Sequence, residues 1–479
     1  MKITRIPRII CGALLPHFAF GLCDHFSQSF MFPREGYRRL AIQQAGWHQL
    51  TFYNEHKQKS NTQLYGFFQR SSPCSEEQNI PGYFLPILCG DTITIKGDVD
   101  PFRDVRAEYL GLPSDFVGSI TLDPHQQQGG FVLEYYHELR RFFKHKFFRH
   151  MWVGFFIPFV DVRNNLGLTQ DVQHEGTPRL NAPSDALEAL DQPAWNFGRL
   201  RTCSTEKKGI AEIRIKLGKL FMARDNCEVN LYTMVVFPTI KGQNPKYLFS
   251  AFVGPNHHYA FGTGVNFQFP LFENLFDRPE WAVNFFVNVE HLYRIPNDQC
   301  RTFDLVDKPW SRFLLITTRD ATPLTQAIPG VNVLTLSVQV KPHSLVEFQT
   351  GIRFVEGHIE AEVGYNLFAH PTEEICFSHH WPEIFGIRGS VSGTTASEST
   401  ISTLAADDDE FVPIRFCDID INSGAARGAI THTVYGTLSY VYRGWYADLL
   451  LNAGGFVEFT QNNAALKQWG IWGKIGWSL

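Results

Sequence analysis

Residues 334–367 alternate apolar and polar side chains through three successive segments joined by very short breaks. The last of these segments places Ile359 and Val363 on one face, against Glu360 and Glu362 on the other. Because successive side chains on a strand point to opposite faces, each segment is predicted to be a strand with one apolar and one polar face. The short breaks predict that the three strands are neighbours in one sheet.

Similar tracts recur from residue 115 onward, separated by Gly, Pro, Asn and Asp at turns. Examples are the alternating runs at 211–217, 259–269 and 430–443. The tracts predict an all-β chain of about 14 antiparallel strands, within a range of about 12 to 16, and an even number is expected if they close into a barrel. One short helical insertion is predicted at 180–192, where Ser184 precedes a helix-forming run.

Long alternating strands occur in two kinds of protein. In a soluble sandwich the apolar faces pack inward, whereas in an outer-membrane barrel they face lipid and polar residues line the interior. Several tracts extend over about 10 residues, enough to cross a bilayer, whereas strands of soluble domains are usually nearer five or six. Aromatic residues also gather at strand ends, as at Tyr259, Phe269, Tyr293 and Tyr440. These features favour an antiparallel transmembrane β-barrel.

The N-terminus is typical of an exported protein. A basic start with Lys2 and Arg5 precedes an apolar stretch at 9–22, and small residues precede a cleavage position after Gly21. This pattern predicts a secretory signal peptide at residues 1–21.

The chain ends on an alternating tract in which Trp469, Ile471, Ile475, Trp477 and Leu479 share one face. This tract resembles the C-terminal signal of bacterial outer-membrane barrels, in which an apolar terminal residue follows an aromatic residue two positions earlier. The usual terminal residue there is phenylalanine, so Leu479 departs from the pattern. The resemblance implies insertion by the barrel-assembly machinery through the C-terminal strand.

With its export signal and strand pattern, the chain resembles porins and barrels of the long-chain fatty-acid transporter family. The resemblance is architectural, and it implies an outer-membrane location and passage of small solutes or hydrophobic compounds. No motif names a substrate, and one fold hosts many functions. The alternative is a secreted or periplasmic all-β protein that binds or hydrolyses polysaccharide, with its apolar strand faces buried between two sheets.

The predicted barrel occupies residues 114–479, whereas residues 22–113 are less periodic and are interpreted as a plug, a lid or the first strands. Residues 387–410 are rich in Ser, Thr, Gly and Ala and end in four acidic residues, which predicts a mobile, solvated loop.

The composition excludes other classes of protein. Aromatic residues make up 14% of the 479 residues, yet the mean hydropathy is only -0.16. A polytopic helical membrane protein would need several runs of about 20 apolar residues, so that class is excluded. A net charge of -5 and an isoelectric point near 6.4 provide no basic surface for nucleic acid.

Few residues are arranged for chemistry. The histidine pairs at 257–258 and 379–380 have no third ligand at metal spacing, and the nine cysteines form no zinc pattern. Asp418 and Asp420 could form an acid and base pair, although polar residues that satisfy one another explain them as well. No nucleophile motif is present. We therefore expect no catalytic residues, no metal, no cofactor and no enzymatic activity.

Under the barrel hypothesis, the polar strand faces line the interior and their charges set selectivity for solutes. The pore-lining candidates are Glu212, Arg214, Lys216, Asn284, Asn288, Glu290, Glu347, Gln349, Arg353, Glu360 and Glu362.

Overall fold

The computed structural model describes residues 34–45, 60–72, 91–97, 102–139, 148, 150–177, 182–224, 227–240, 242–273, 281–318, 328–377, 380–387, 413–444, 447–461 and 464–478. The predicted signal peptide, residues 388–410 of the predicted loop, His379 and Leu479 lie outside these residues. None of the described helices is long and apolar enough to cross a membrane.

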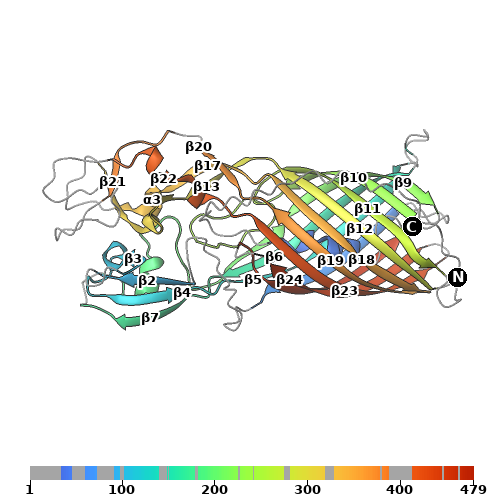
Figure 1. Ribbon diagram of the computed structural model, residues 1–479, viewed down its shortest axis with the longest axis horizontal. Helices are drawn as coiled ribbons and strands as arrows, with labels where there is room; N and C mark the ends of the chain where they lie inside the picture. Colours follow the sequence, from blue (N-terminus) through green and yellow to red (C-terminus); the bar gives the residue numbers. More distant parts are fainter. Residues whose placement is uncertain are drawn as a thin grey trace.

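Twelve antiparallel strands close into a barrel (Figure 1). They are β1 (Ser60–Ser71), β5 (His125–Glu138), β6 (Met151–Asn165), β9 (Glu212–Arg224), β10 (Cys227–Pro238), β11 (Ala260–Glu273), β12 (Trp281–Arg294), β18 (Ser344–Glu356), β19 (Ile359–His370), β23 (Ala429–Arg443), β24 (Asp448–Thr460) and β25 (Gln468–Ser478). Each pairs with the next in this order, and β1 pairs with β25 to complete the ring. A thirteenth strand, β8 (Thr205–Ile210), extends the sheet beside β6.

The strand number corrects the predicted value of about 14, although twelve is within the predicted range. Some alternating tracts form strands outside the ring. The first segment of the 334–367 pattern is β17 (Thr335–Lys341), which pairs with β13 (Asn297–Thr302) and β20 (Glu374–Phe377) in a separate three-stranded sheet. The prediction that all three segments are neighbours in one sheet was therefore wrong for β17. It was correct for β18 and β19, which pair along their length.

The barrel exposes its apolar face and buries its polar face. Ile352 of β18 is 50% exposed and Val363 of β19 is 66% exposed, whereas Gln349, also in β18, is fully buried. The same contrast holds in β25, where Ile471 is 55% exposed and Lys474 only 4%. An apolar exterior around a polar interior is the arrangement of a barrel that sits in lipid.

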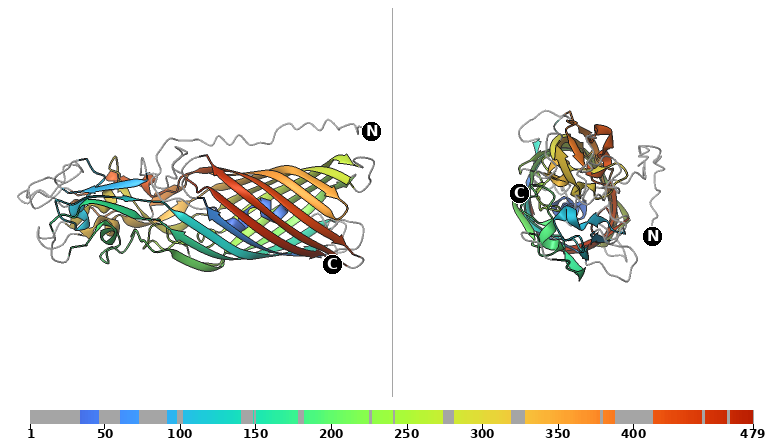
Figure 2. Two further views of the ribbon diagram at one scale, coloured as in Figure 1. Left: turned by 90° about the horizontal axis from the view of Figure 1, so that it is seen from below. Right: turned by 90° about the vertical axis from the view of Figure 1, so that its left-hand side faces the viewer.

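The described parts of the longest connections lie at one end of the barrel, where they form a second folded region that we call the head (Figures 1 and 2). Besides the β13-β17-β20 sheet, the head contains a four-stranded sheet of β3 (Val105–Arg106), β2 (Thr92–Lys96), β4 (Val117–Thr121) and β7 (Thr169–His174). Smaller sheets are β16 (Ile328–Pro329) with β15 (Leu315–Thr318) and β21 (Phe385–Ile387), and β14 (Asp304–Leu305) with β22 (Ile419–Asp420). Short helices complete it: η3 (Ala107–Leu110), α2 (Ala186–Leu190), η7 (Ser311–Phe313), α3 (Gly330–Val333), η8 (Phe416–Asp418) and η9 (Ile421–Gly424).

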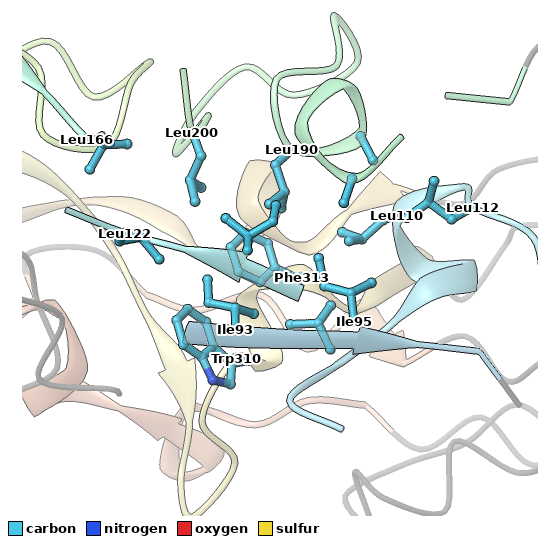
Figure 3. Close-up of a cluster of buried hydrophobic side chains, with 14 of the residues drawn as sticks. Ile93, Ile95, Leu110, Leu112, Leu122, Leu166, Leu190, Leu200, Trp310 and Phe313 are labelled. Atoms are coloured by element: carbon cyan, nitrogen blue, oxygen red, sulfur yellow. The ribbon is translucent and has the colours of Figure 1, made fainter. Parts of the chain in front are cut away.

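The head has hydrophobic cores of its own. In one of them Ile93 and Ile95 of β2 lie beneath Leu190 of α2, next to Trp310 and Phe313 (Figure 3). These side chains come from segments far apart in the sequence, so the long connections fold together as one packed unit and not as separate loops.

The predicted helix at 180–192 is α2, and its N-cap is Asp185, one residue after Ser184. The Asp185 side chain accepts a hydrogen bond from the Glu188 backbone N–H, while Ser184 donates its hydroxyl to the Glu188 carboxylate. Two further short α-helices, α1 (Leu40–Gln44) and α3, were not predicted, because one helical turn is too short to show a periodic pattern.

The less periodic region at 22–113 is divided among several parts of the structure. Within its described part, residues 34–45 lie inside the barrel, β1 is a strand of the wall, and residues 91–97 and 102–113 belong to the head.

Candidate functional site in the barrel lumen

Residues 34–45, which we call the inner segment, lie inside the barrel (blue in Figures 1 and 2). The segment contains η1 (Gly36–Arg38) and α1 (Leu40–Gln44), and every residue of both helices is buried. Tyr37, Ala41 and Ile42 pack against aromatic side chains of the inner wall, including Phe156. The segment therefore fills space that an open channel would leave to water.

Arg34 anchors the start of the inner segment to four strands. Its guanidinium donates to the Glu347 carboxylate of β18 at 2.5 Å, to Glu458 of β24 at 2.6 Å and to Asn366 of β19 at 2.9 Å. A longer contact of 3.4 Å reaches the hydroxyl of Thr433 in β23. Since the Arg34 side chain is only 3% exposed, these hydrogen bonds replace nearly all of its contact with water.

Arg39 makes the second anchor. Its guanidinium binds both oxygens of Glu458, at 2.6 and 3.1 Å, and also donates to the side chains of Gln69 and Gln468. Glu458 thus holds two arginines of the inner segment at once. Such a fully hydrogen-bonded buried group is costly to break, because removing one partner leaves a buried charge uncompensated, at about 3–5 kcal/mol.

A second charged cluster lies on β9 and β12, and its Glu290 is the cross-strand neighbour of Glu347 in the first anchor. Arg214 donates to its neighbour Glu212 in β9 and lies 3.6 Å from the Glu290 carboxylate of β12. Tyr37 of the inner segment donates its hydroxyl to Glu212 at 3.3 Å. Wall and inner segment are therefore joined by polar contacts at both clusters.

Two lysines hold the other end of the inner segment. Lys474 of β25 donates to the backbone carbonyls of Gln43 and Ala45 at 2.9 and 3.0 Å, and Lys216 of β9 reaches the Gln43 side chain at 3.4 Å. The last carbonyls of a helix have no partner within it, so cations there satisfy them and complement the helix dipole.

Gly36 allows the inner segment to lie this close to the wall. A Cβ atom at this position would be 2.7 Å from the Phe67 ring and 2.8 Å from the Gln69 amide. Its backbone N–H donates to the Gln128 side chain at 2.9 Å. Any larger residue would displace the segment or its wall contacts.

A row of amide side chains, the amide belt, crosses four neighbouring strands inside the barrel. It consists of Asn230 of β10, Asn266 of β11, Asn288 of β12 and Gln349 of β18, which donate to one another in sequence at 2.8–3.2 Å. Gln349 then donates to Tyr435, whose hydroxyl donates to Glu362, which is paired with Arg353. The belt is fully hydrogen-bonded, so it fixes the inner wall without a ligand.

The structure buries nine of the eleven pore-lining candidates on the inner face of the wall: Glu212, Arg214, Lys216, Asn288, Glu290, Glu347, Gln349, Arg353 and Glu362. Asn284 and Glu360 are on the same face but are only partly buried, nearer the strand ends opposite the head. Glu347 contacts the first anchor, residues 212, 214 and 290 form the second cluster, and Lys216 reaches the inner segment. Asn288 and Gln349 belong to the amide belt, which continues to Glu362 and Arg353. Their role in selecting solutes stays a prediction.

Sequence analysis missed Arg34, Arg39 and Glu458. The only signal in the sequence was the group of arginines around Gly36, which would need acidic partners if it were buried. It carries no strand or helix periodicity, however, and its partners are more than 300 residues away in sequence.

The other candidate groups have local roles. Asp418 accepts the Arg415 backbone N–H and Asp420 accepts that of Asn422, so each caps a short helix. Burial and nearby Arg294 lower the pKa of His258 to about 3, so this residue is neutral. Among the described residues, no three His, Cys, Asp or Glu side chains are placed to hold a metal ion.

No family model and no curated protein matches this sequence. Among solved structures, it is similar to an outer membrane channel from Pseudomonas putida F1, with 8% identity over 90% of this chain and 100% of that chain and a TM-score of 0.41. It is also similar to a FadL homologue from Pseudomonas aeruginosa, with 8% identity over 94% of this chain and 99% of that chain and a TM-score of 0.31. The transport unit of the autotransporter AIDA-I from Escherichia coli gives 8% identity, coverages of 91% and 94%, and a TM-score of 0.34.

Likenesses this distant transfer no function to the chain. The architecture of this chain is instead established by its own strand pairing and by which strand faces are buried. The chain is a closed antiparallel barrel of the outer-membrane type. The architectural resemblance predicted from the sequence is thereby confirmed.

Proposed function

We propose that this protein is an outer-membrane barrel through which small solutes or hydrophobic compounds pass, and that the inner segment closes the passage until it moves. The observation that carries the proposal is the apolar exterior around a polar, occupied lumen. Lipid satisfies the exterior, while the interior is built from groups that need hydrogen-bonding partners.

The connections support an orientation. Turns at one end are short, such as the two residues between β18 and β19, whereas the connection from β19 to β23 at the head end runs from residue 371 to 428. Outer-membrane barrels have short periplasmic turns and longer extracellular loops, so the head would face the cell exterior. Export by the signal peptide at 1–21 and insertion through the C-terminal strand belong to the same proposal.

The contacts of the inner segment favour a gated passage and not a permanently open pore. It is held by ion pairs and hydrogen bonds, and hydrophobic contact is limited to a few residues such as Ile42. Polar contacts can be exchanged for water or solute contacts, so a displaced segment would leave Glu347, Glu458 and Glu212 to line the opening. These carboxylates would then favour cationic or neutral solutes.

The alternative, a soluble polysaccharide-binding or hydrolytic protein, predicted that Ile352 and Val363 are buried between two sheets. Both are at least half exposed on the outside of a single closed sheet. That prediction was wrong, and the described residues include no second sheet packed on this face.

Planar-bilayer conductance tests the proposal. We expect the unmodified protein to give a small, intermittent conductance. The double variant R34A/R39A removes both anchors, and its conductance should be several-fold higher. Arg415→Ala, an exposed arginine of the head, is the matched control and should behave like the unmodified protein. Release of the mature protein from cells without detergent would refute the membrane location, and equal conductance of the double variant would refute gating by the inner segment.

A further inference from the structure

The head contains a cavity of about 260 Å³ that the lumen site does not include. It lies between the connection at residues 242–257, strand β13 and Arg312 of η7. The lining combines amide and charged side chains with apolar ones such as Leu248 and Phe249, and its Asn256 and Gln299 side chains are hydrogen-bonded to each other. Its size suits a solute of one or two small rings, below the usual range of about 300–1,000 Å³ for drug-sized ligands.

The backbone around the cavity adopts conformations that side chains disfavour. Asn256 and His257 have φ angles of 49° and 66°, and Phe249 has 56°, all in the left-handed region. Gly242 lies so close that a Cβ atom there would be 2.6 Å from the Asn256 side-chain oxygen. Uncommon backbone conformations cluster at ligand sites, so three of them around one cavity support a binding role for it.

The amide groups of the cavity are held in fixed orientations. Asn256 accepts the Gln243 backbone N–H at 2.7 Å and donates to Gln299 at 2.8 Å. Gln299 donates to Asn297 and to Nε2 of His258, which is the acceptor because its Nδ1 donates to the Ile295 carbonyl at 2.9 Å. A site whose polar groups are already positioned loses less entropy when a ligand binds.

The charges of the cavity argue against an anionic ligand. Arg312 donates to both carboxylate oxygens of Asp304, and Arg301 is paired with Glu373 at 2.9 Å. Asp298 in the lining is exposed. With both arginines compensated and an acceptor carboxylate at the rim, the lining favours groups that donate and accept hydrogen bonds without charge.

We propose that this cavity binds a small neutral solute rich in hydroxyl and amide groups, of the class to which N-acetylated amino sugars belong. The site goes beyond passage through the lumen, and its test needs no conductance. Its position in the head places it on the side from which a solute would approach the barrel.

Protection of Cys300 provides the test, because this free cysteine lines the cavity and is exposed. The full-length protein in a sugar-free detergent is labelled with a maleimide, with and without N-acetylglucosamine, and each cysteine is followed by peptide mass spectrometry. We expect saturable slowing at Cys300 by at least threefold. Cys203 and Cys417 are exposed free thiols outside the cavity lining, so their rates should stay unchanged and report an intact head.

Gln299→Leu removes the central amide, and the concentration of N-acetylglucosamine for half protection should rise at least tenfold. Gln339→Leu, an exposed glutamine in the same sheet, is the matched control and should leave it unchanged. Unaltered Cys300 labelling at saturating sugar would overturn the proposal. Protection by benzoate in place of the sugar would also overturn it, because it would show an anion site.

Discussion

Strands β17 and β19 have the same alternating pattern but bury opposite faces. In β17, Val338 and Val340 are fully buried in the head, whereas the alternating Ser337 and Gln339 are exposed. In β19, Val363 is 66% exposed, while Glu362 and Asn366 are nearly inaccessible. Alternation therefore specifies that a strand has two different faces, but it does not specify whether the apolar face meets protein or lipid.

Strand length and the intervening turns separate the two cases. β17 has seven residues, whereas β18 has 13 and β19 has 12, and about 9–11 are needed to cross a bilayer. A tight turn at Gly357, with a φ of 56°, joins β18 to β19 as a hairpin. Between β17 and β18 the chain instead turns at Pro342 and at His343, whose φ is 59°, and passes from the head into the wall.

The largest expected effect comes from a charge in β17. Val340→Asp places a carboxylate without a partner in the head core, and we expect a loss of about 4 kcal/mol or more in the stability of the head. Hydrogen exchange of the β13, β17 and β20 amides should lose protection, while the wall strands keep theirs. Unchanged protection in β17 would show that its apolar face is not buried.

A charge in the wall acts through lipid. Val363→Lys should cost about 2–4 kcal/mol in folding into lipid vesicles, because the ammonium must leave water for the membrane interior. Guanidinium titration in vesicles measures this. The head should be unaffected, and a variant that folds normally in vesicles but loses head protection would contradict the assignment of Val363 to the lipid face.

Removing methyl groups distinguishes the two environments more finely. Val338→Ala should cost about 2 kcal/mol, because it leaves a cavity in a packed core. Val363→Ala should cost less than about 1 kcal/mol, since lipid chains move into the vacated space. Equal losses for the two variants in the same vesicles would mean that both valines are packed against protein.

Single cysteine substitutions on the two strands should leave the stability of the protein nearly unaltered and differ only in which maleimide labels them. In a chain whose nine native cysteines are serine, Ser337→Cys should react with a charged, membrane-impermeant maleimide, because Ser337 faces water. Val363→Cys should react only with a membrane-soluble reagent. The opposite result at either position would reverse the assignment of its face.

Much of the wall follows from local pattern. We predicted that Glu347 and Arg353 point to the barrel interior and that β18 pairs with β19. Both predictions were possible because a period of two fixes which side chains share a face. The strand number was less certain, since a short alternating tract such as β17 gives the same local pattern as part of a longer strand. The inner segment was left open as a plug, a lid or the first strands, because Arg34 and Arg39 belong to no repeating pattern.

The cavity in the head could not be predicted either. Asn256, Gln299 and Arg312 lie in three connections, and each resembles an ordinary loop or edge residue in sequence. The nearby histidines at 257 and 258 showed no metal spacing in the sequence, and the fold adds that His258 is buried and orients Gln299.

The sequence by itself determined that the chain is a set of strands with one apolar and one polar face, because side-chain direction on a strand depends only on residue parity. Tertiary structure decided which strands cross the membrane, that twelve of them close the ring, and that residues 34–45 occupy the lumen. These outcomes depend on contacts between residues hundreds of positions apart, such as Arg39 with Glu458. No local pattern encodes such a contact, because either side chain would be equally satisfied by water in the unfolded chain.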